Sequence, residues 1–230
     1  MCIRDRYDDL DSICATFGFG TPTGVRSLGD GAGLEKWTGP ILEFDSQANW
    51  EVQMRRGTNG LQVVEGTPAQ VARAMCGLAT GVLPELRLID RVGQDVLPPQ
   101  LARRLPYSEE NLNTIRKAMW GVCNEREGSA YDVLSVADLG FAMAAKTGSA
   151  DLESRQNADG ESVVSKHTWL AGWAPAEDPQ IVFCMFVYDT IATSSHSSVY
   201  VAQQLFRDPD VRAFLEARGV PLAAVPGAGR

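Results

Sequence analysis

Cysteine and histidine motifs that would bind a metal are missing from this sequence of 230 residues. None of the five cysteines forms a C-x-x-C pair, and neither of the two histidines stands near a cysteine at the spacing of zinc ligands. The sequence therefore predicts no metal site. Because a free cysteine is among the residues most often buried, we expect Cys76, Cys123 and Cys184 to be buried thiols.

Positive charge and long apolar runs are also scarce. Lys and Arg total 21 against 29 Asp and Glu, so the formal net charge is -8 and the pI is near 4.8. A surface of this charge repels phosphate, and we expect no nucleic-acid partner. The most apolar stretch, residues 181–188, is far shorter than the roughly 20 residues of a membrane-spanning helix, so none is predicted.

The chain is 44% hydrophobic, which is enough to form the core of one domain or, at most, two. Four segments of it carry helix signals. Thr67, Pro68 and Gln70 make a capping box with proline in the first helical position, and Asp208 is a candidate cap further on. Four apolar residues behind Ser108 fall at helical spacing: Leu112, Ile115, Met119 and Val122. The expected helices run from Pro68 to near Gly81, from after Ser108 to about Cys123, and over residues 198–206 and 209–218.

Strand signals dominate after residue 139. We expect strands at residues 141–149, 168–174 and 181–188, the last of which is a nearly continuous apolar run. The polar residues 151–165 are expected to form an exposed loop between the first two strands. Earlier in the chain, residues 17–39 are typical of ordered turns, and residues 83–105 of an irregular connection with a minor strand at 87–92.

The run Lys146-Thr147-Gly148-Ser149 lies on the first of these strands and is suited to hold a carboxylate. Lys146 carries a positive charge, and the hydroxyls of Thr147 and Ser149 offer hydrogen-bond donors. Gly148 has no side chain, so a ligand can approach the strand closely. The alternative is that Lys146 is an ordinary lysine at a strand end and Thr147 a residue that favours strands.

We do not expect a histidine to act as a catalytic base. A Ser-His-Asp triad is conceivable from composition, but His167 begins a strand with no nucleophile-elbow motif near it, which indicates a structural histidine. Trp169 and Trp173 lie four residues apart on the same strand and therefore on one face. We expect both to pack in the core against a helix.

The order of these motifs resembles the class B penicillin-binding proteins, the peptidoglycan D,D-transpeptidases. Besides Lys146 to Ser149 and the strand that follows, the resemblance rests on Phe-Gly-Phe-Gly-Thr-Pro-Thr-Gly at residues 17–24, Gly-Thr-Pro-Ala-Gln at 66–70 and Ser-Glu-Glu-Asn-Leu at 108–112. It covers residues 17–206. It implies an α/β (α+β) fold of the serine β-lactamase/D,D-peptidase-like transpeptidase type, in which an antiparallel sheet is flanked by helices.

Two motifs of that family are absent. S-x-x-K and S-x-N accompany K-T-G in these enzymes, but no lysine here has a serine three residues before it, and S-x-N does not occur. In the family both precede the Phe-Gly-Phe-Gly segment, so we expect an N-terminally truncated chain, inactive by itself, in which residues 7–218 are the C-terminal part of the transpeptidase domain. Residues 1–6 resemble a translated sequencing adapter, and residues 219–230 are expected to be a flexible tail. Two strands of the family's sheet would then be missing, which would leave the outer edge of residues 181–188 open.

For the parent protein the resemblance implies acyl transfer through a serine, with no metal or other cofactor. The serine would attack the D-Ala-D-Ala carbonyl of a peptidoglycan stem peptide, and the same site would bind β-lactams. Lys146, Thr147, Gly148 and Ser149 would bind the substrate, with the backbone N–H of Ser149 in the oxyanion hole. Further partners would be cell-wall elongation or division proteins, with elongation favoured. The location would be the outer face of the bacterial cytoplasmic membrane, reached through an N-terminal anchor that this sequence lacks.

Two alternatives stay open. A β-lactamase or β-lactam sensor shares the fold, although the segments at residues 17–20 and 66–70 resemble the transpeptidases specifically. The other alternative is a non-catalytic scaffold that binds cell-wall assembly proteins. An S-x-x-K motif upstream in the gene would distinguish the enzyme from the scaffold.

Overall fold

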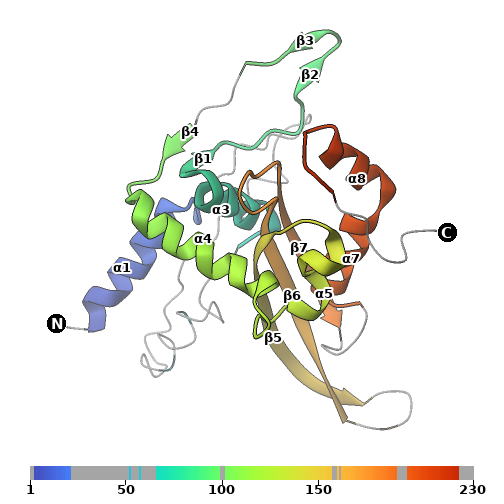
Figure 1. Cartoon of the computed structure of the whole chain (residues 1–230). Coiled ribbons are helices and arrows are strands. Elements are labelled where there is room, and N and C mark those ends of the chain that lie inside the picture. The colour runs from blue at the N-terminus through green and yellow to red at the C-terminus, as the bar shows by residue number, and fades with distance from the viewer. Residues whose placement is uncertain are drawn as a thin grey trace. The chain divides into compact units, whose positions relative to one another are not determined.

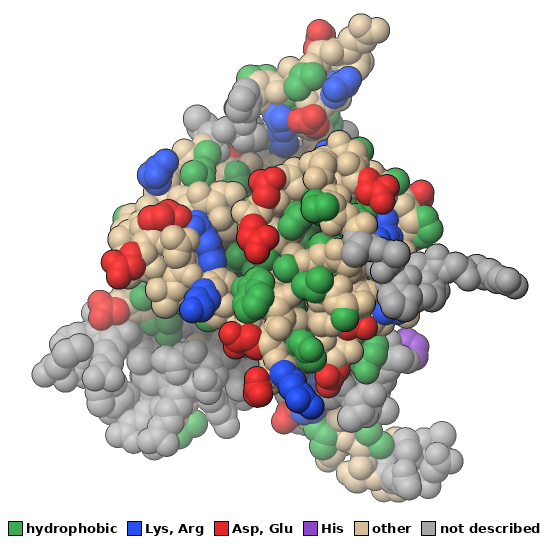
Figure 2. All heavy atoms as spheres, in the orientation of Figure 1, with side chains coloured by type: hydrophobic (Ala, Val, Ile, Leu, Met, Phe, Trp, Pro, Cys, Tyr) green, Lys and Arg blue, Asp and Glu red, His purple; other side chains and the backbone are tan. Residues whose placement is uncertain are grey.

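The computed structural model describes residues 3–21, 52, 57, 66–98, 102–156, 160, 162–190 and 196–222 (Figure 1). The chain divides into two compact units, Met1–Pro106 and Tyr107–Arg230. Acidic and basic side chains are interspersed over the described surface that Figure 2 shows, and they do not gather into a patch of one sign there. None of the described helices is long and apolar enough to cross a membrane.

Short elements make up the described part of the first unit. It contains two helices, α1 (Ile3–Thr16) and α3 (Pro68–Thr80), and four strands, β1 (Val82–Pro84), β2 (Arg91–Val92), β3 (Asp95–Val96) and β4 (Ala102–Arg104). Two antiparallel pairs form, β1 with β4 and β2 with β3. The connection expected over residues 83–105 therefore contains more pairing than predicted. The minor strand expected at residues 87–92 is confined to Arg91–Val92.

Helix α3 confirms the prediction made from its capping box. The backbone N–H of Gln70 donates to Oγ1 of Thr67 at 3.2 Å, and the N–H of Thr67 donates back to Oε1 of Gln70 at 2.9 Å. The helix ends at Gly81, whose φ of 76° is in the left-handed region and whose N–H donates to Gly77 O at 2.8 Å. Glycine adopts this conformation without a steric cost, which explains why the helix stops there.

Helix α1 was not predicted. Its 14 residues include four aspartates and two arginines, so no continuous apolar stripe reveals it in the sequence. Residues 3–6, which resemble adapter sequence, lie within this helix. The expected turns are confirmed directly after it, where Gly18 and Gly20 have φ values of 87° and 72°. The rest of that prediction, residues 22–39, lies outside the described residues.

The second unit is built on a three-stranded antiparallel sheet in the order β5-β6-β7. The strands are β5 (Ala144–Gln156), β6 (Ser162–Ala174) and β7 (Ile181–Thr190). The helices are α4 (Glu109–Asn124), α5 (Tyr131–Leu134), α6 (Val136–Leu139), α7 (Ser198–Arg207) and α8 (Pro209–Glu216). All three predicted strands and the three long predicted helices are confirmed, with shifted ends. Among the described residues, β7 pairs with β6 alone.

The prediction of a loop over residues 151–165 is wrong. Strands β5 and β6 continue as a long hairpin, paired as far as Gln156 and Ser162, with a register shift between Asp151 and Ser154 (Figure 1). The backbone hydrogen bonds between the strands form with polar side chains as well as with apolar ones. The polar composition of residues 151–165 is therefore compatible with a paired strand as well as with a loop.

The core of the second unit lies between the sheet and α7. Phe206 of α7 is fully buried, and its ring makes edge contacts with Phe141 and Phe183 at centroid distances of 5.8 and 5.1 Å. The cluster also includes Leu134, Leu139, Met143, Leu170 and Leu215. Burial of each such side chain contributes about 1.5–3 kcal/mol. This core fixes the N-terminal part of β5, just before the Lys146-Thr147-Gly148-Ser149 run.

Several burial predictions need correction. Cys123 is buried as expected, but Cys76 and Cys184 are only partly buried. Ile115 is 46% exposed, although Leu112 and Met119 on the same helix are buried. Trp173 is buried and donates from Nε1 to Ala176 O at 3.1 Å. Trp169, by contrast, is partly exposed on the sheet and contacts Phe186 of the neighbouring strand.

Candidate functional site

The candidate site lies on β5, where the run Lys146-Thr147-Gly148-Ser149 is paired in regular register with β6. Lys146 stands opposite Ala171 and Ser149 opposite Thr168. Successive side chains of a strand point to opposite faces. The side chains of Thr147 and Ser149 therefore start from one face, and that of Lys146 starts from the other.

Lys146 nevertheless brings its charge to the edge of the strand. Its exposed side chain bends so that Nζ donates to the backbone oxygen of Thr147 at 2.6 Å. Thr147 is partly buried and Ser149 exposed. A ligand at this edge would therefore meet the ammonium group together with the two hydroxyls.

The edge of β5 that faces away from β6 also carries peptide groups that do not pair with a described strand. The oxygens of Met143 and Thr147 accept side-chain hydrogen bonds, from Asn124 Nδ2 at 2.9 Å and from Lys146 Nζ at 2.6 Å. In an antiparallel ladder, alternate residues direct both N–H and C=O to the same side. Ser149 follows Thr147 by two residues in the same regular register, so its backbone N–H faces this edge too. No described strand pairs there.

Gly148 lies against an aromatic side chain. A Cβ added at Gly148 would come within 3.3 Å of Trp169 Cβ, which is a tight contact. The Trp169 ring in turn packs on Phe186 at a centroid distance of 4.3 Å. A side chain at Gly148 would have to push this pair away or protrude from the strand.

Ser129 is a neighbour of the site that the sequence did not reveal. Its Oγ lies 2.8 Å from Oγ1 of Thr147, although the two residues are 18 positions apart. It belongs to the short connection between α4 and α5. A lone serine in a turn carries no recognisable motif, and only the fold brings it to β5.

His167 has the structural surroundings expected for it. Its Nδ1 accepts a hydrogen bond from the backbone N–H of Asp189 at 3.2 Å, and its ring lies 4.4 Å from that of Tyr188. A ring nitrogen used in this way is occupied and does not serve as a base. Its place in the sheet gives it a packing role.

Neither Cys123 nor Cys184 replaces a catalytic serine. Burial raises the pKa of Cys123 to about 12 and that of Cys184 to about 11. A thiol with such a pKa is protonated at neutral pH, and only the thiolate is a strong nucleophile. Among the described side chains, no group of three or more His, Cys, Asp or Glu is arranged to hold a metal ion.

The site therefore has groups for binding but no serine and lysine of the S-x-x-K type, which the sequence lacks. Lys146 supplies a charge, Thr147 and Ser149 supply hydroxyls, and Ser149 adds a backbone N–H at the open edge. These groups suit a carboxylate and a developing oxyanion.

Known proteins share this fold and sequence pattern. Residues 6–208 match the family described as "Penicillin binding protein transpeptidase domain". Two curated relatives are named peptidoglycan D,D-transpeptidase MrdA. The one from Salmonella typhimurium is 23% identical over 197 residues, or 78% of this chain and 31% of the relative. The one from Haemophilus influenzae is 24% identical over 210 residues, or 83% of this chain and 31% of the relative. The chain thus spans 31% of the length of these relatives.

Solved structures give the same result for the fold. Penicillin-binding protein PBP2 from Helicobacter pylori, in complex with MreC, superposes with a TM-score of 0.65 at 20% identity, over 91% of this chain and 35% of that one. Penicillin-binding protein 3 from Mycobacterium tuberculosis, in complex with ampicillin, has a TM-score of 0.63 at 22% identity, over 97% of this chain and 48% of that one. The fold expected from the sequence, helices around an antiparallel sheet of the transpeptidase type, is confirmed.

Proposed function

Because the chain belongs to the penicillin-binding protein transpeptidase domain family, we propose that β5 holds the substrate in the active site of a peptidoglycan D,D-transpeptidase. One observation carries the proposal: the open edge of β5 combines the Lys146 ammonium, the Thr147 hydroxyl and the backbone N–H of Ser149. The curated relatives are named transpeptidases, which favours this function over a β-lactamase or a β-lactam sensor of the same fold.

The substrate is a stem peptide that ends in D-Ala-D-Ala. Its terminal carboxylate binds between the Lys146 ammonium and the hydroxyls of Thr147 and Ser149, through charge-assisted hydrogen bonds. Gly148 leaves room for the peptide to lie along the strand. An aligned peptide then presents its scissile carbonyl near the N–H of Ser149.

The reaction is acyl transfer. A serine attacks the carbonyl between the two D-alanines, the C–N bond breaks, and D-alanine leaves after it gains a proton. The amine of a neighbouring stem peptide then attacks the acyl-serine ester and releases the serine. The N–H of Ser149 stabilises the oxyanion in both steps, and such a donor contributes about 10² to 10³ in rate. The serine and its lysine base come from outside these 230 residues.

The same family membership supports a proposal for the partners and the location. A penicillin-binding protein of this fold binds ampicillin, and another binds MreC. We propose that the whole protein binds β-lactams at the β5 site, works with cell-wall elongation proteins, and acts at the outer face of the cytoplasmic membrane.

The test is carboxylate binding by the chain itself. Titration of the ¹⁵N-labelled chain with acetyl-D-Ala-D-Ala should shift the amide signals of residues 146–149, and Lys146→Ala should weaken binding by about 10-fold or more, because a hydrogen bond to a charged group contributes about 1.5–3 kcal/mol. The matched control is Lys166→Ala, which removes a lysine of the same hairpin that pairs with Asp151 at 3.0 Å. Equal affinity for the wild type and Lys146→Ala would refute the proposed site.

A further inference from the structure

We propose that Ser129 positions the substrate-binding hydroxyl of Thr147. This inference rests on the proposed function of β5. The observation behind it is the 2.8 Å distance between Ser129 Oγ and Thr147 Oγ1, which is a hydrogen bond in which either oxygen could donate. Ser129 acts through Thr147 and is therefore a positioning residue.

The direction of this hydrogen bond decides what Thr147 can do. A hydroxyl has one hydrogen to donate and two lone pairs to accept with. If Thr147 donates to Ser129, it has no hydrogen left for a carboxylate. If Ser129 donates, Thr147 keeps its own hydrogen for the ligand. A bound carboxylate accepts only, so it selects the chain Ser129 to Thr147 to carboxylate, in which each hydrogen bond strengthens the next.

Ser129 is held in place by the turn around it. The N–H of Gly128 donates to Glu125 O at 2.8 Å, and the N–H of Ala130 donates to Val122 O at 3.0 Å. Ala130 is only 2% exposed and belongs to the core cluster. The residues on both sides of Ser129 are thus fixed to the end of α4, which holds the backbone of Ser129 within reach of Thr147.

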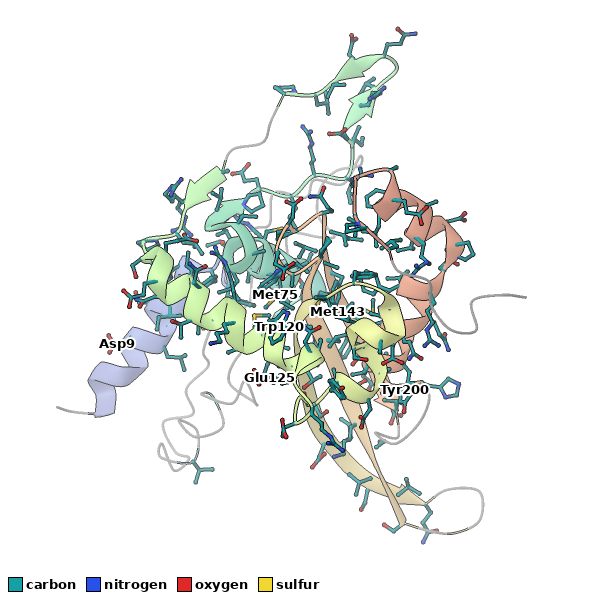
Figure 3. All side chains as sticks on the ribbon, viewed as in Figure 1. Asp9, Met75, Trp120, Glu125, Met143 and Tyr200 are labelled. Carbon is teal, nitrogen blue, oxygen red and sulfur yellow. The ribbon has the colours of Figure 1, made fainter. Side chains whose placement is uncertain are left out.

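A second tie connects the same end of α4 to β5. Asn124 Nδ2 donates to Trp120 O at 2.7 Å and to Met143 O at 2.9 Å. Figure 3 shows Trp120 and Glu125 near this end of α4, with Met143 beside them on the chain that leads into β5. The Asn124 tie and the turn at Gly128 are independent of the Ser129 hydroxyl. These contacts therefore hold the backbone of Ser129 near β5 without help from the Ser129 hydroxyl.

The experiment compares Ser129→Ala with Ser129→Thr in the whole chain. The ¹⁵N-labelled variants are titrated with acetyl-D-Ala-D-Ala and with its C-terminal amide, which has no carboxylate. We expect Ser129→Ala to bind the acid about fivefold more weakly, because one hydrogen bond contributes about 1 kcal/mol. Ser129→Thr, which keeps the hydroxyl, should bind within about twofold of the wild type. Affinity for the amide should not change in either variant.

Thr114→Ala is the matched control, because it removes an exposed hydroxyl from α4 that donates to Glu110 O at 3.0 Å, in the first half of the helix. It should bind the acid as the wild type does. Wild-type affinity in Ser129→Ala would overturn the inference. Equal losses for the acid and the amide, or no rescue by threonine, would also overturn it, because they indicate a general structural role.

Thr147→Val separates this inference from the proposed function. If Thr147→Val weakens binding of the acid while Ser129→Ala does not, the proposed function stands and the role of Ser129 is wrong. If the wild type does not bind the acid, or Thr147→Val binds it as the wild type does, the carboxylate site itself is wrong and both proposals fail.

Discussion

Replacement of Gly128 by alanine should destabilise the turn that carries Ser129. A Cβ at this position would lie 2.4 Å from both Gly121 O and Val122 O. These oxygens belong to the backbone of α4, so no side-chain rotation can relieve the contact. The turn and the helix end would have to separate by roughly 1 Å to restore normal contact distances.

The cost follows from this displacement. Forcing one extra carbon into a closely packed position costs about 1–3 kcal/mol. The shift also lengthens the hydrogen bonds that Gly128 and Ala130 make to Glu125 O and Val122 O, at 2.8 and 3.0 Å in the native turn. We expect the free energy of unfolding to fall by about 2–3 kcal/mol. Because Ser129 moves with the turn, binding of acetyl-D-Ala-D-Ala should weaken as well.

Urea denaturation followed by tryptophan fluorescence gives the free energy of unfolding, and Gly121→Ala is the matched control. Gly121 lies inside α4, and the three atoms nearest to a Cβ there all belong to the carboxylate of Glu125, the closest of them at 3.0 Å. That side chain can rotate away, and alanine favours a helix over glycine by about 1 kcal/mol. We expect Gly121→Ala to match or exceed the wild type. If Gly128→Ala were as stable as Gly121→Ala, the turn would not be packed tightly against α4. The proposed positioning role of Ser129 would then lose its basis.

Two further outcomes test the core and the thiols. Phe206→Ala should lower the free energy of unfolding by about 3–5 kcal/mol, whereas Leu205→Ala, one residue earlier and 37% exposed, should cost clearly less; similar losses in urea denaturation would contradict the assigned core. Cys123 should react with iodoacetamide at pH 8 far more slowly in the folded chain than in urea, as peptide mass spectrometry can measure, because burial raises its pKa to about 12 and keeps the thiol protonated. Equal rates in the two states would show that Cys123 is accessible.

The sequence predicted those elements whose signals are local. The capping box at Thr67 and Gln70 identifies the start of α3, and Asp208 identifies the start of α8, where its side chain accepts from the N–H of Asp210 at 2.9 Å. Hydrogen bonds between residues no more than three positions apart can be recognised from the residue types in the sequence. Such signals place an element but say nothing about its neighbours in space.

Elements whose form depends on the rest of the fold were missed. The polar composition beyond Asp151 is typical of a loop, but β5 and β6 pair there through their backbones, and that pairing leaves no apolar pattern in the sequence. Helix α1 lacks a continuous apolar stripe, so no helical period indicates it in the sequence. Ser129 shows the same limit at the site, because its contact with Thr147 depends on the packing of α4 against β5.

The motif gave the residues of the site, and the strand edge explains how they act together. Because successive side chains of β5 point to opposite faces, the Lys146 side chain leaves one face and those of Thr147 and Ser149 leave the other. The two faces meet only at the edge, and there Lys146 Nζ reaches Thr147 O at 2.6 Å. A carboxylate bound over either face would lose one of these groups. We therefore expect substrate to bind along the edge of β5, where the charge, both hydroxyls and the N–H of Ser149 converge.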